Sequence, residues 1–306
     1  MARFSSARSN AADAVAEALK YFESQTGNRQ NNLVRAQVLL AEGLRFFTPA
    51  QDLRLYAMLQ FYMAKTHTEL HSRVGESALR DAIRCYEEAL RFFTVERDPV
   101  EYGLIQYSMG NVYRFRFDGG RSQNLERAIS RFTEARKFIT PAVSPLDYAG
   151  ILHCMGIVYA DSDLSTDTRD SNLRRAIMCY TEVLKFRTPE AQPYDYAVTQ
   201  NNLGVVYFEL NTGNRQSNLQ QAIECFNQAL RFHTASAYPD DYVRAKGNLA
   251  NAYLELPLPD RAANVKKAIA FYEEALRLCT AERDQSGYAA LQLQLSKAYR
   301  YLATGS

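Results

Sequence analysis

Residues 194–234 read YDYAVTQNNLGVVYFELNTGNRQSNLQQAIECFNQALRFHT. The second half of this stretch has apolar or small residues at the spacing of one face of an α-helix: Leu219, Ala222, Ile223, Phe226, Ala229 and Leu230. The first half carries Leu203, Gly204 and Tyr207, which are apolar or small residues where a first helix would contact its partner. We therefore expect two helices joined by a short loop, with Asn218 as the N-cap of the second helix.

The same pattern occurs six times along the chain. The first apolar residue of each second helix marks the period, at steps of 46, 46, 48, 46 and 46 residues: Leu33, Leu79, Leu125, Leu173, Leu219 and Val265. A tyrosine of each first helix recurs in the same register: Tyr56, Tyr102, Tyr148, Tyr196, Tyr242 and Tyr288. One repeating unit fills the chain, so we expect a single all-α array of 13 helices and not two domains. The expected repeats are 10–48, 49–94, 95–140, 141–188, 189–234 and 235–280, followed by a capping helix at 285–302.

The repeated residues resemble the signature of the tetratricopeptide repeat (TPR) family. Leu203, Gly204 and Tyr207 match L-G-x-x-Y, and the second helix matches A-x-x-x-F-x-x-A, although the family's tryptophan is missing. The resemblance covers residues 10–302 and implies a right-handed α-solenoid of stacked antiparallel helix pairs. Units of 46 residues are longer than the usual ~34. Long units rich in Asn-Asn-Leu are similar to kinesin-light-chain repeats and to arrays of bacterial signalling proteins, some of which lie beside caspase-like protease domains.

Composition narrows the functional classes. Hydrophobic residues make up 47% of the chain and charged residues 23%, which is typical of a globular protein and not of a disordered one. The net charge of +2 is too balanced for a protein that mainly coats nucleic acid. No apolar stretch approaches the ~18 residues of a membrane span, and the first ten residues lack the core of a signal peptide. Five cysteines, an odd number, fit a reducing compartment, so we predict a cytoplasmic protein.

No group of residues predicts catalysis or metal binding. His67 and His71 have the i, i+4 spacing of a helical metal site, but the sequence places no third ligand near them. Cys154 has only the adjacent His153 as a base, and neighbouring residues on a helix point ~100° apart. We therefore expect no enzyme activity, no catalytic residue, no metal and no cofactor.

An arginine recurs in the loop between the two helices of a repeat. It is found at Arg29, Arg121, Arg169, Arg215 and Arg261, and Gly75 breaks the series. Recurrence in nearly every loop indicates a structural role, in helix-end hydrogen bonds or in pairing between neighbouring repeats. A row of ligand-binding arginines is the alternative interpretation.

The resemblance implies that the first helices line a concave groove that binds a partner. Carrying over the family's groove positions gives the candidate partner-binding residues Tyr62, Lys65, Tyr107, Ser108, Asn111, Asn201, Asn202, Arg244, Asn248 and Asn251. Asparagine suits peptide capture because its amide both donates and accepts hydrogen bonds, as an extended backbone does. We expect Arg244, Asn248 and Asn251 to converge with Asn202. The alternative is that Asn202 and Asn248 bond only within the array.

The main functional hypothesis is a non-catalytic adaptor that binds a peptide or protein segment in this groove, with no nucleic-acid partner. The alternative is a regulatory or sensor subunit that docks or inhibits a separate effector, such as a caspase-like protease or a cytoskeletal protein. The family's clamp for a C-terminal carboxylate is matched by Asn202 and Arg244, whereas His153, Ile157 and Asn248 occupy its other positions. Chaperone-tail binding is therefore not expected.

Overall fold

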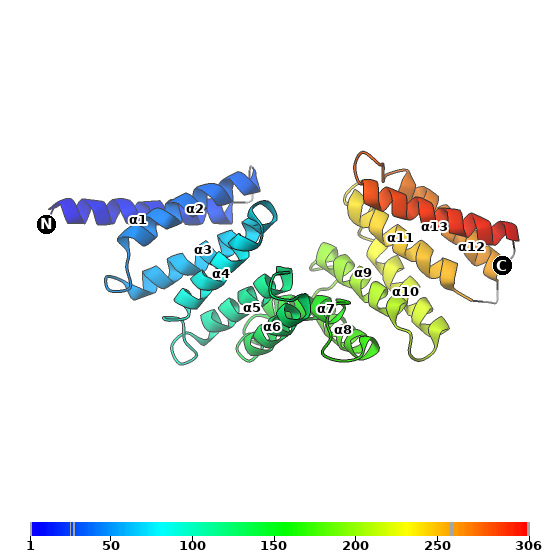
Figure 1. Ribbon diagram of the computed structural model, residues 1–306, viewed down its shortest axis with the longest axis horizontal. Coiled ribbons are helices and arrows are strands. Elements are labelled where there is room, and N and C mark those ends of the chain that lie inside the picture. Colours follow the sequence, from blue (N-terminus) through cyan, green and yellow to red (C-terminus); the bar gives the residue numbers. More distant parts are fainter. Residues whose placement is uncertain (1, 25, 27, 258–259, 305–306) are drawn as a thin grey trace. The chain divides into compact units, whose positions relative to one another are not determined.

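The computed structural model describes residues 2–24, 26, 28–257 and 260–304, and its regular secondary structure is entirely α-helical in these ranges. This part of the chain contains thirteen helices, which confirms the predicted all-α class and the helix number (Figure 1). Their bounds are α1 (Ala2–Glu23), α2 (Arg29–Phe46), α3 (Leu53–Val74), α4 (Glu76–Ala89), α5 (Pro99–Phe115), α6 (Arg121–Ala135), α7 (Pro145–Tyr159), α8 (Arg169–Val183), α9 (Pro193–Glu209), α10 (Arg215–Leu230), α11 (Pro239–Glu255), α12 (Arg261–Leu276) and α13 (Gln285–Thr304).

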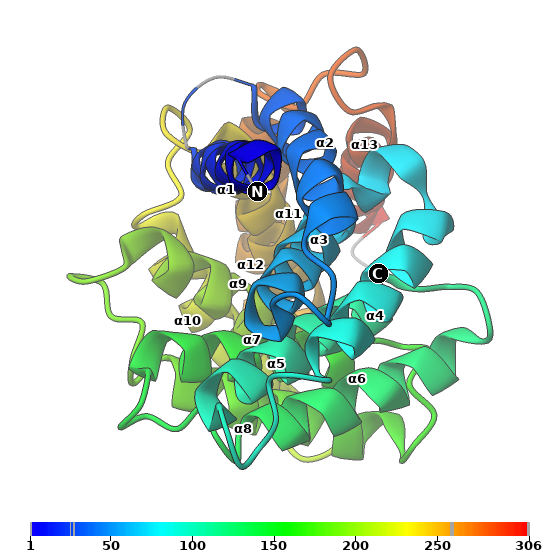
Figure 2. The ribbon, with the colours of Figure 1, turned by 90° about the vertical axis from the view of Figure 1, so that its left-hand side faces the viewer.

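The chain divides into two compact units, an N-terminal unit of Met1–Ser144 and a C-terminal unit of Pro145–Ser306. Within each unit, consecutive helices pack together as antiparallel pairs, and Figure 2 shows α1 next to α2 and α3 next to α4. Successive first helices also touch, since α3 contacts α1 and α5, and α11 contacts α9 and α13. The odd-numbered helices α9, α11 and α13 are therefore neighbours in the C-terminal unit.

The glycine of the repeat signature lies directly against the aromatic ring of the second helix. A β-carbon at Gly204 would lie 2.6 Å from a ring carbon of Phe226, closer than atoms can approach. The same contact is made by Gly110 with Phe132 and by Gly156 with Tyr180. Glycine at this position lets the two helices pack closely around a fully buried ring.

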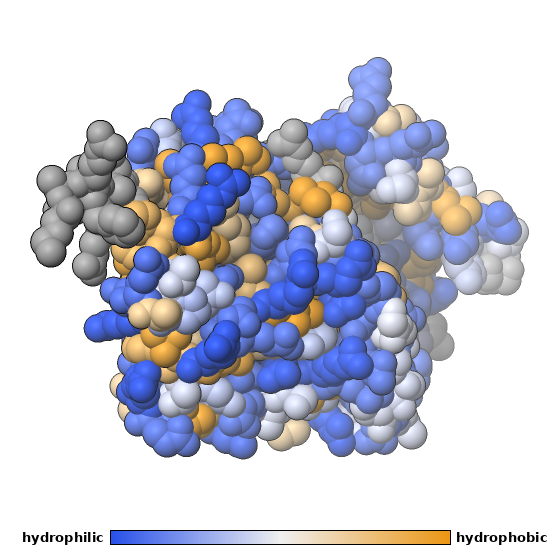
Figure 3. All heavy atoms as spheres, turned by 60° about the vertical axis from the view of Figure 1, so that its left-hand side comes forward, coloured by the Kyte–Doolittle hydropathy of each residue, from blue (hydrophilic) through white to orange (hydrophobic). Residues whose placement is uncertain are grey.

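Polar side chains, blue in Figure 3, cover most of the face shown there, and apolar side chains, orange, form smaller groups between them.

The repeated asparagine has a different role from the predicted one. Helix α10 begins at Arg215, and Asn214 is its N-cap, with a side chain that accepts from the Ser217 N–H at 3.0 Å. Asn218 lies one turn inside the helix, so the prediction that it caps the helix was wrong. Its side-chain amide instead donates to the backbone carbonyls of Leu210 and Thr212, at 3.0 and 3.1 Å. Equivalent bonds from Asn32, Asn124 and Asn172 show that this asparagine anchors the loop between paired helices.

The recurrent loop arginine joins neighbouring helix pairs, which confirms the structural role predicted for it. Arg215 donates to the carbonyls of Phe208 and Leu210 at the end of α9, where the helix has no internal donors left. Its guanidinium also pairs with Glu255 at the end of α11, in the next helix pair. The same pairing occurs between Arg29 and Glu69 and between Arg169 and Glu209.

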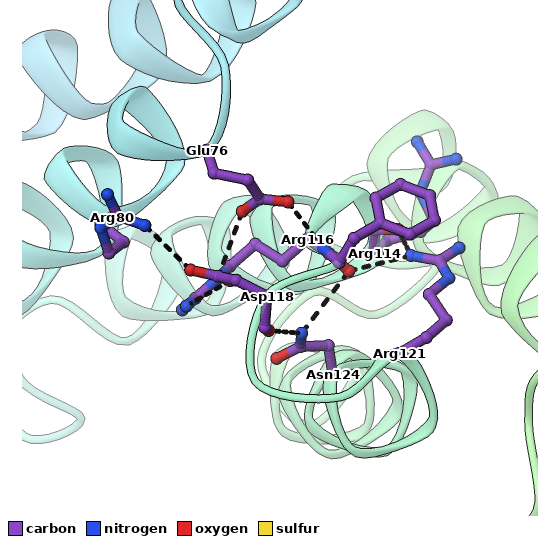
Figure 4. A network of polar contacts seen from close by, with 8 residues as sticks. Glu76, Arg80, Arg114, Arg116, Asp118, Arg121 and Asn124 are labelled. Carbon is purple, nitrogen blue, oxygen red and sulfur yellow. Dashed lines mark hydrogen bonds and ion pairs between the residues drawn. The ribbon is translucent and has the colours of Figure 1, made fainter.

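The N-terminal unit contains another ionic network, next to Gly75, where the arginine series is broken. The Asp118 carboxylate forms ion pairs with Arg80 of α4, at 3.0 Å, and with Arg116, at 2.7 Å (Figure 4). The Glu76 carboxylate accepts a hydrogen bond from the Phe117 N–H at 2.7 Å. Desolvation acts to raise the pKa of Asp118, but the two guanidiniums outweigh it and hold that pKa below its usual value. Charges from the start of α4 thus replace the missing arginine in joining this pair to the next.

Candidate functional site

The ten predicted partner-binding residues all lie on first helices of the pairs, in two separate sets. The N-terminal unit contains Tyr62 and Lys65 on α3, and Tyr107, Ser108 and Asn111 on α5. The C-terminal unit contains Asn201 and Asn202 on α9, and Arg244, Asn248 and Asn251 on α11.

Amide and imidazole side chains bridge successive first helices of the C-terminal unit. Asn248 on α11 donates to the Oδ1 of Asn201 on α9, at 3.3 Å. One pair earlier, Asn202 on α9 lies 3.5 Å from the Nε2 of His153 on α7, and the His153 Nδ1 lies 3.3 Å from the Thr199 hydroxyl. Asn201 and His153 occupy the same repeat position, as do Asn248 and Asn202. Asn201 is only 4% exposed, so its side chain serves the bridge.

The polar groups of α11 also have partners in the fold. The Oδ1 of Asn251 accepts from the Tyr272 hydroxyl at 2.6 Å, and Arg244 forms an ion pair with Asp241. These contacts leave the Oδ1 of Asn248 and the side-chain NH2 of Asn251 without a hydrogen bond to any described residue. Both atoms therefore remain able to bind a ligand.

Arg244, Asn248 and Asn251 line a cleft of about 580 Å³ between α11, the loop after α12, and α13. Asn202, which was expected to join them, does not line it. We call this space the α11–α13 cleft; its lining is Asp240, Val243, Arg244, Gly247, Asn248, Asn251, Tyr272, Leu278, Cys279, Arg283, Asp284, Gly287, Ala290, Leu291 and Gln294. Its volume lies in the ~300–1,000 Å³ range of typical ligand sites.

Opposite charges balance one another in the cleft. Arg283 forms an ion pair with Asp240 at 2.8 Å. The Asp284 carboxylate accepts hydrogen bonds from the Gly287 N–H and the Ser286 hydroxyl, each at 3.0 Å. Those hydrogen bonds lower the pKa of Asp284 below its ordinary value. Burial, with a smaller effect from the Asp284 carboxylate, raises the pKa of the Cys279 thiol. Cys279 is therefore a poor nucleophile at neutral pH.

The side chains of the N-terminal set contact other residues of the N-terminal unit. The Tyr62 ring lies 5.5 Å from the Phe22 ring, burial raises the pKa of Tyr62, and the Lys65 ammonium lies 5.2 Å above Phe22. The Tyr107 ring lies 5.9 Å from Phe132. Ser108 bonds to the Leu104 carbonyl of its own helix, at 2.9 Å.

Asn111 occupies the repeat position of Asn251 but lacks its hydrogen bond. Its Oδ1 is buried with no partner among the described residues. Phe132 stands where the other pair has Tyr272, and a phenyl ring has no hydroxyl to donate. The two clefts described in the N-terminal unit are lined by other residues, whereas three residues of the C-terminal set line the α11–α13 cleft, so the C-terminal set is the stronger candidate.

Sequence reasoning missed the wall that α13 contributes to the cleft. Small residues make room in the cleft: Gly247 on α11, Cys279 in the loop after α12, and Gly287 and Ala290 on α13. The three beyond α11 were not candidates. A signal was present, because the residues 46 positions earlier are all larger: Asn201, His233, Asp241 and Arg244.

Among the described residues, no cluster of three or more His, Cys, Asp or Glu side chains is arranged to hold a metal ion. No described helix combines the length and the apolar character needed to cross a bilayer. All five cysteines are free thiols.

Comparison with known proteins adds support at the level of the fold. No protein-family profile matches the chain, and no curated protein matches it. Twenty-three chains of solved structures do match. One is from the "Crystal structure of APC/C hetero-tetramer Cut9-Hcn1", with a TM-score of 0.52 and 16% identity, covering 94% of this chain and 46% of that one. The present chain thus spans about half the length of that protein. The likeness confirms an all-α, TPR-like solenoid and shows the fold alone.

Proposed function

We propose that this chain is a non-catalytic adaptor that binds a peptide or protein segment along its first helices, with the α11–α13 cleft as the principal site. The observation that carries this proposal is the convergence of Arg244, Asn248 and Asn251 on one cleft of about 580 Å³. TPR-like solenoids are suited to such binding because their stacked helices present extended surfaces. The proposal treats the six repeats and α13 as one array that works in a reducing compartment.

The chemistry of the cleft suits an extended peptide. The Asn248 Oδ1 can accept a backbone N–H, and the Asn251 NH2 can donate to a backbone C=O. Arg244 is 56% exposed at the rim, so a partner can reach its guanidinium without unfolding α11. Val243, Leu278 and Leu291 add apolar surface between these polar groups.

The test uses a phage-displayed library of random peptides, selected on the immobilised full chain and then measured by calorimetry as synthetic peptides. Replacing Arg244 or Asn248 with Ala is expected to weaken binding by about 1–2 kcal/mol, the cost of a lost, partly buried hydrogen bond. Lys185→Ala is the matched control, because Lys185 is also exposed, at 64% against 56% for Arg244, and forms the same kind of i, i+3 ion pair, with Glu182. Unchanged affinity in both α11 variants would exclude the cleft as the principal site. Selection of no peptide at all, but capture of one folded effector, would favour the regulatory-subunit alternative.

A further inference from the structure

The last two junctions between successive first helices of the C-terminal unit, α9–α11 and α11–α13, have the same arrangement in matching register. In the α9–α11 junction, α9 and α11 are first helices of successive pairs, and the loop after α10 lies between them in the chain. The α11–α13 junction repeats this arrangement 46 residues later, with the loop after α12. Because every position in one junction has a counterpart in the other, differences in side chains can be compared directly.

Three aromatic rings cluster at the α9–α11 junction, with His233 buried beneath Tyr194 and Tyr238, which are 41% and 40% exposed. The rings of Tyr194 and Tyr238 lie 4.8 Å apart, and the His233 ring lies 5.6 Å from Tyr194 and is only 1% exposed. The Tyr194 hydroxyl donates to Asp241 at 3.3 Å. The counterparts of the three rings in the α11–α13 junction are Asp240, Cys279 and Asp284, none of which is aromatic.

The hydrogen bond that joins α9 to α11, and the ion pair within α11, also have no counterpart in the second copy. Gly247 replaces Asn201, which accepts the hydrogen bond of Asn248 in the first copy. Gly287 and Ala290 replace the ion pair of Asp241 with Arg244. Among the described residues, a β-carbon at Gly247 would approach only Leu291, at 3.1 Å. The α11–α13 cleft is the space that these smaller side chains leave open.

We propose that the α11–α13 cleft binds an uncharged aromatic side chain, that of tyrosine, presented by the peptide partner. This inference rests on the adaptor function proposed above and names what the cleft recognises. The partner's ring would lie where aromatic residues of the chain itself lie one junction earlier. Val243, Leu278 and Leu291 supply apolar contacts for the ring.

Charge and hydrogen bonding favour tyrosine over other occupants. The lining contains two carboxylates, Asp240 and Asp284, and two guanidiniums, Arg244 and Arg283, so its formal charge is zero. A phosphorylated or otherwise charged side chain would gain no net attraction there. A phenol hydroxyl has both a donor and an acceptor, which fits a rim that carries carboxylates as well as guanidiniums. Tyr194 shows such a bond in the first junction, to Asp241.

The experiment compares two pentapeptides, acetyl-Gly-Ser-Tyr-Ser-Gly-amide and the same peptide with alanine in place of tyrosine, by saturation-transfer NMR on the full chain. The tyrosine peptide is expected to bind about tenfold more tightly, or more, because burial of the ring favours the complex. Its phosphotyrosine form is expected to bind more weakly than the unmodified peptide. Equal binding of the tyrosine and alanine peptides would overturn the proposal.

Cys279→Phe fills the cleft with a phenylalanine, the residue found at the equivalent positions Phe47 and Phe93. We expect this variant to show no saturation transfer to the tyrosine ring of the peptide. His233→Phe, the same replacement in the α9–α11 junction, is the matched control and should leave binding unchanged. Ala290→Arg places on α13 the residue type that the repeat has at Arg244, and its longer side chain narrows the cleft. It provides a second variant if Cys279→Phe fails to fold. Tyrosine binding that survives in folded Cys279→Phe or Ala290→Arg protein would refute the site. If library peptides still depend on Arg244 in that case, the adaptor function stands without this inference.

Discussion

The α9–α11 and α11–α13 junctions share one arrangement of helices, but three aromatic rings cluster at the first, whereas the second contains a cleft of about 580 Å³. In the first junction, His233 is buried beside Tyr194 and Tyr238. In the second, Cys279 and Gly287 stand at two of the matching positions. An array of repeats can thus acquire a cleft by exchanging large residues for small ones at one junction. The apolar clusters that hold successive helix pairs together need not change, because they are built from other residues, among them Phe226 and Tyr272.

The largest expected effect is on the free energy of unfolding, and it tests whether the buried cores around Phe226 and Tyr272 are equivalent. Phe226 and Tyr272 are the buried rings of the second helices, at 1% and 0% exposure. Replacing either with Ala should cost about 3–5 kcal/mol of unfolding free energy, because each leaves a large cavity. Urea unfolding followed by circular dichroism measures both. A cost below about 1 kcal/mol for Tyr272→Ala alone would mean that the last pair is not packed like its predecessor.

Removing the residue at the centre of each junction should give unequal costs. His233→Ala deletes a buried ring between two tyrosines, and we expect it to cost about 2 kcal/mol. Cys279→Ala removes one sulfur atom beside an existing cleft, so its cost should stay below about 1 kcal/mol. Thermal unfolding of the two variants tests the difference. Equal costs would contradict the contrast between the two junctions.

The α9–α11 junction should also make stability depend on pH. Burial lowers the pKa of His233 from its ordinary 6.5; the Asp241 carboxylate opposes this shift and Arg244 adds to it. Both ring nitrogens are buried without a partner among the described residues. Below pH 6.5 the unfolded chain therefore binds a proton that the folded chain resists, so stability is lost as the pH falls.

From pH 7 to pH 5.5, the protein should lose about 1 kcal/mol more than the His233→Phe variant does. The comparison with that variant is needed because burial also lowers the pKa of His67. Urea midpoints at the two pH values give the measurement. Identical losses in both proteins would show that His233 takes up a proton in the folded state as easily as in the unfolded one.

The smallest expected effect concerns the bridges between first helices. Asn248→Ala breaks the hydrogen bond to the buried Asn201 and should cost about 0.5–1 kcal/mol. Its counterpart is Gln294, and Gly247 stands at the position of Asn201 without a side chain to accept a bond, so Gln294→Ala should change stability by less than about 0.5 kcal/mol. Thermal midpoints of the two variants decide the point. A larger loss for Gln294→Ala would mean that α13 is held across the cleft after all.

Local patterns allowed the helices and their packing to be predicted. The spacing of Ala222, Phe226 and Ala229 indicated the buried face of α10, and all three residues are buried. The contact of Gly204 with Phe226 follows from the same signature. The start of α10 was misplaced by one turn because two asparagines, Asn214 and Asn218, were both suitable caps, and the hydrogen bonds that distinguish them involve the preceding loop.

The site could be predicted only in part, because it depends on contacts between helix pairs. The spacing of Arg244, Asn248 and Asn251 placed them on one face of α11, and they do share a cleft. The partner of Asn202 is His153, 49 residues earlier, and the spacing within one helix carries no information on that contact. The side of the cleft that α13 forms can be predicted only by comparing the sizes of residues 46 positions apart.

We infer that the residues at the matching positions decide whether a junction can hold a tyrosine. The most direct measurement is the number of tyrosine peptides bound per chain after the three rings of the first junction are exchanged for their counterparts in the second, through Tyr194→Asp, His233→Cys and Tyr238→Asp together. Equilibrium dialysis at saturating peptide should find one site in the parent protein and two in this variant. A count that stays at one in the variant, with its helical circular dichroism intact, would contradict the account.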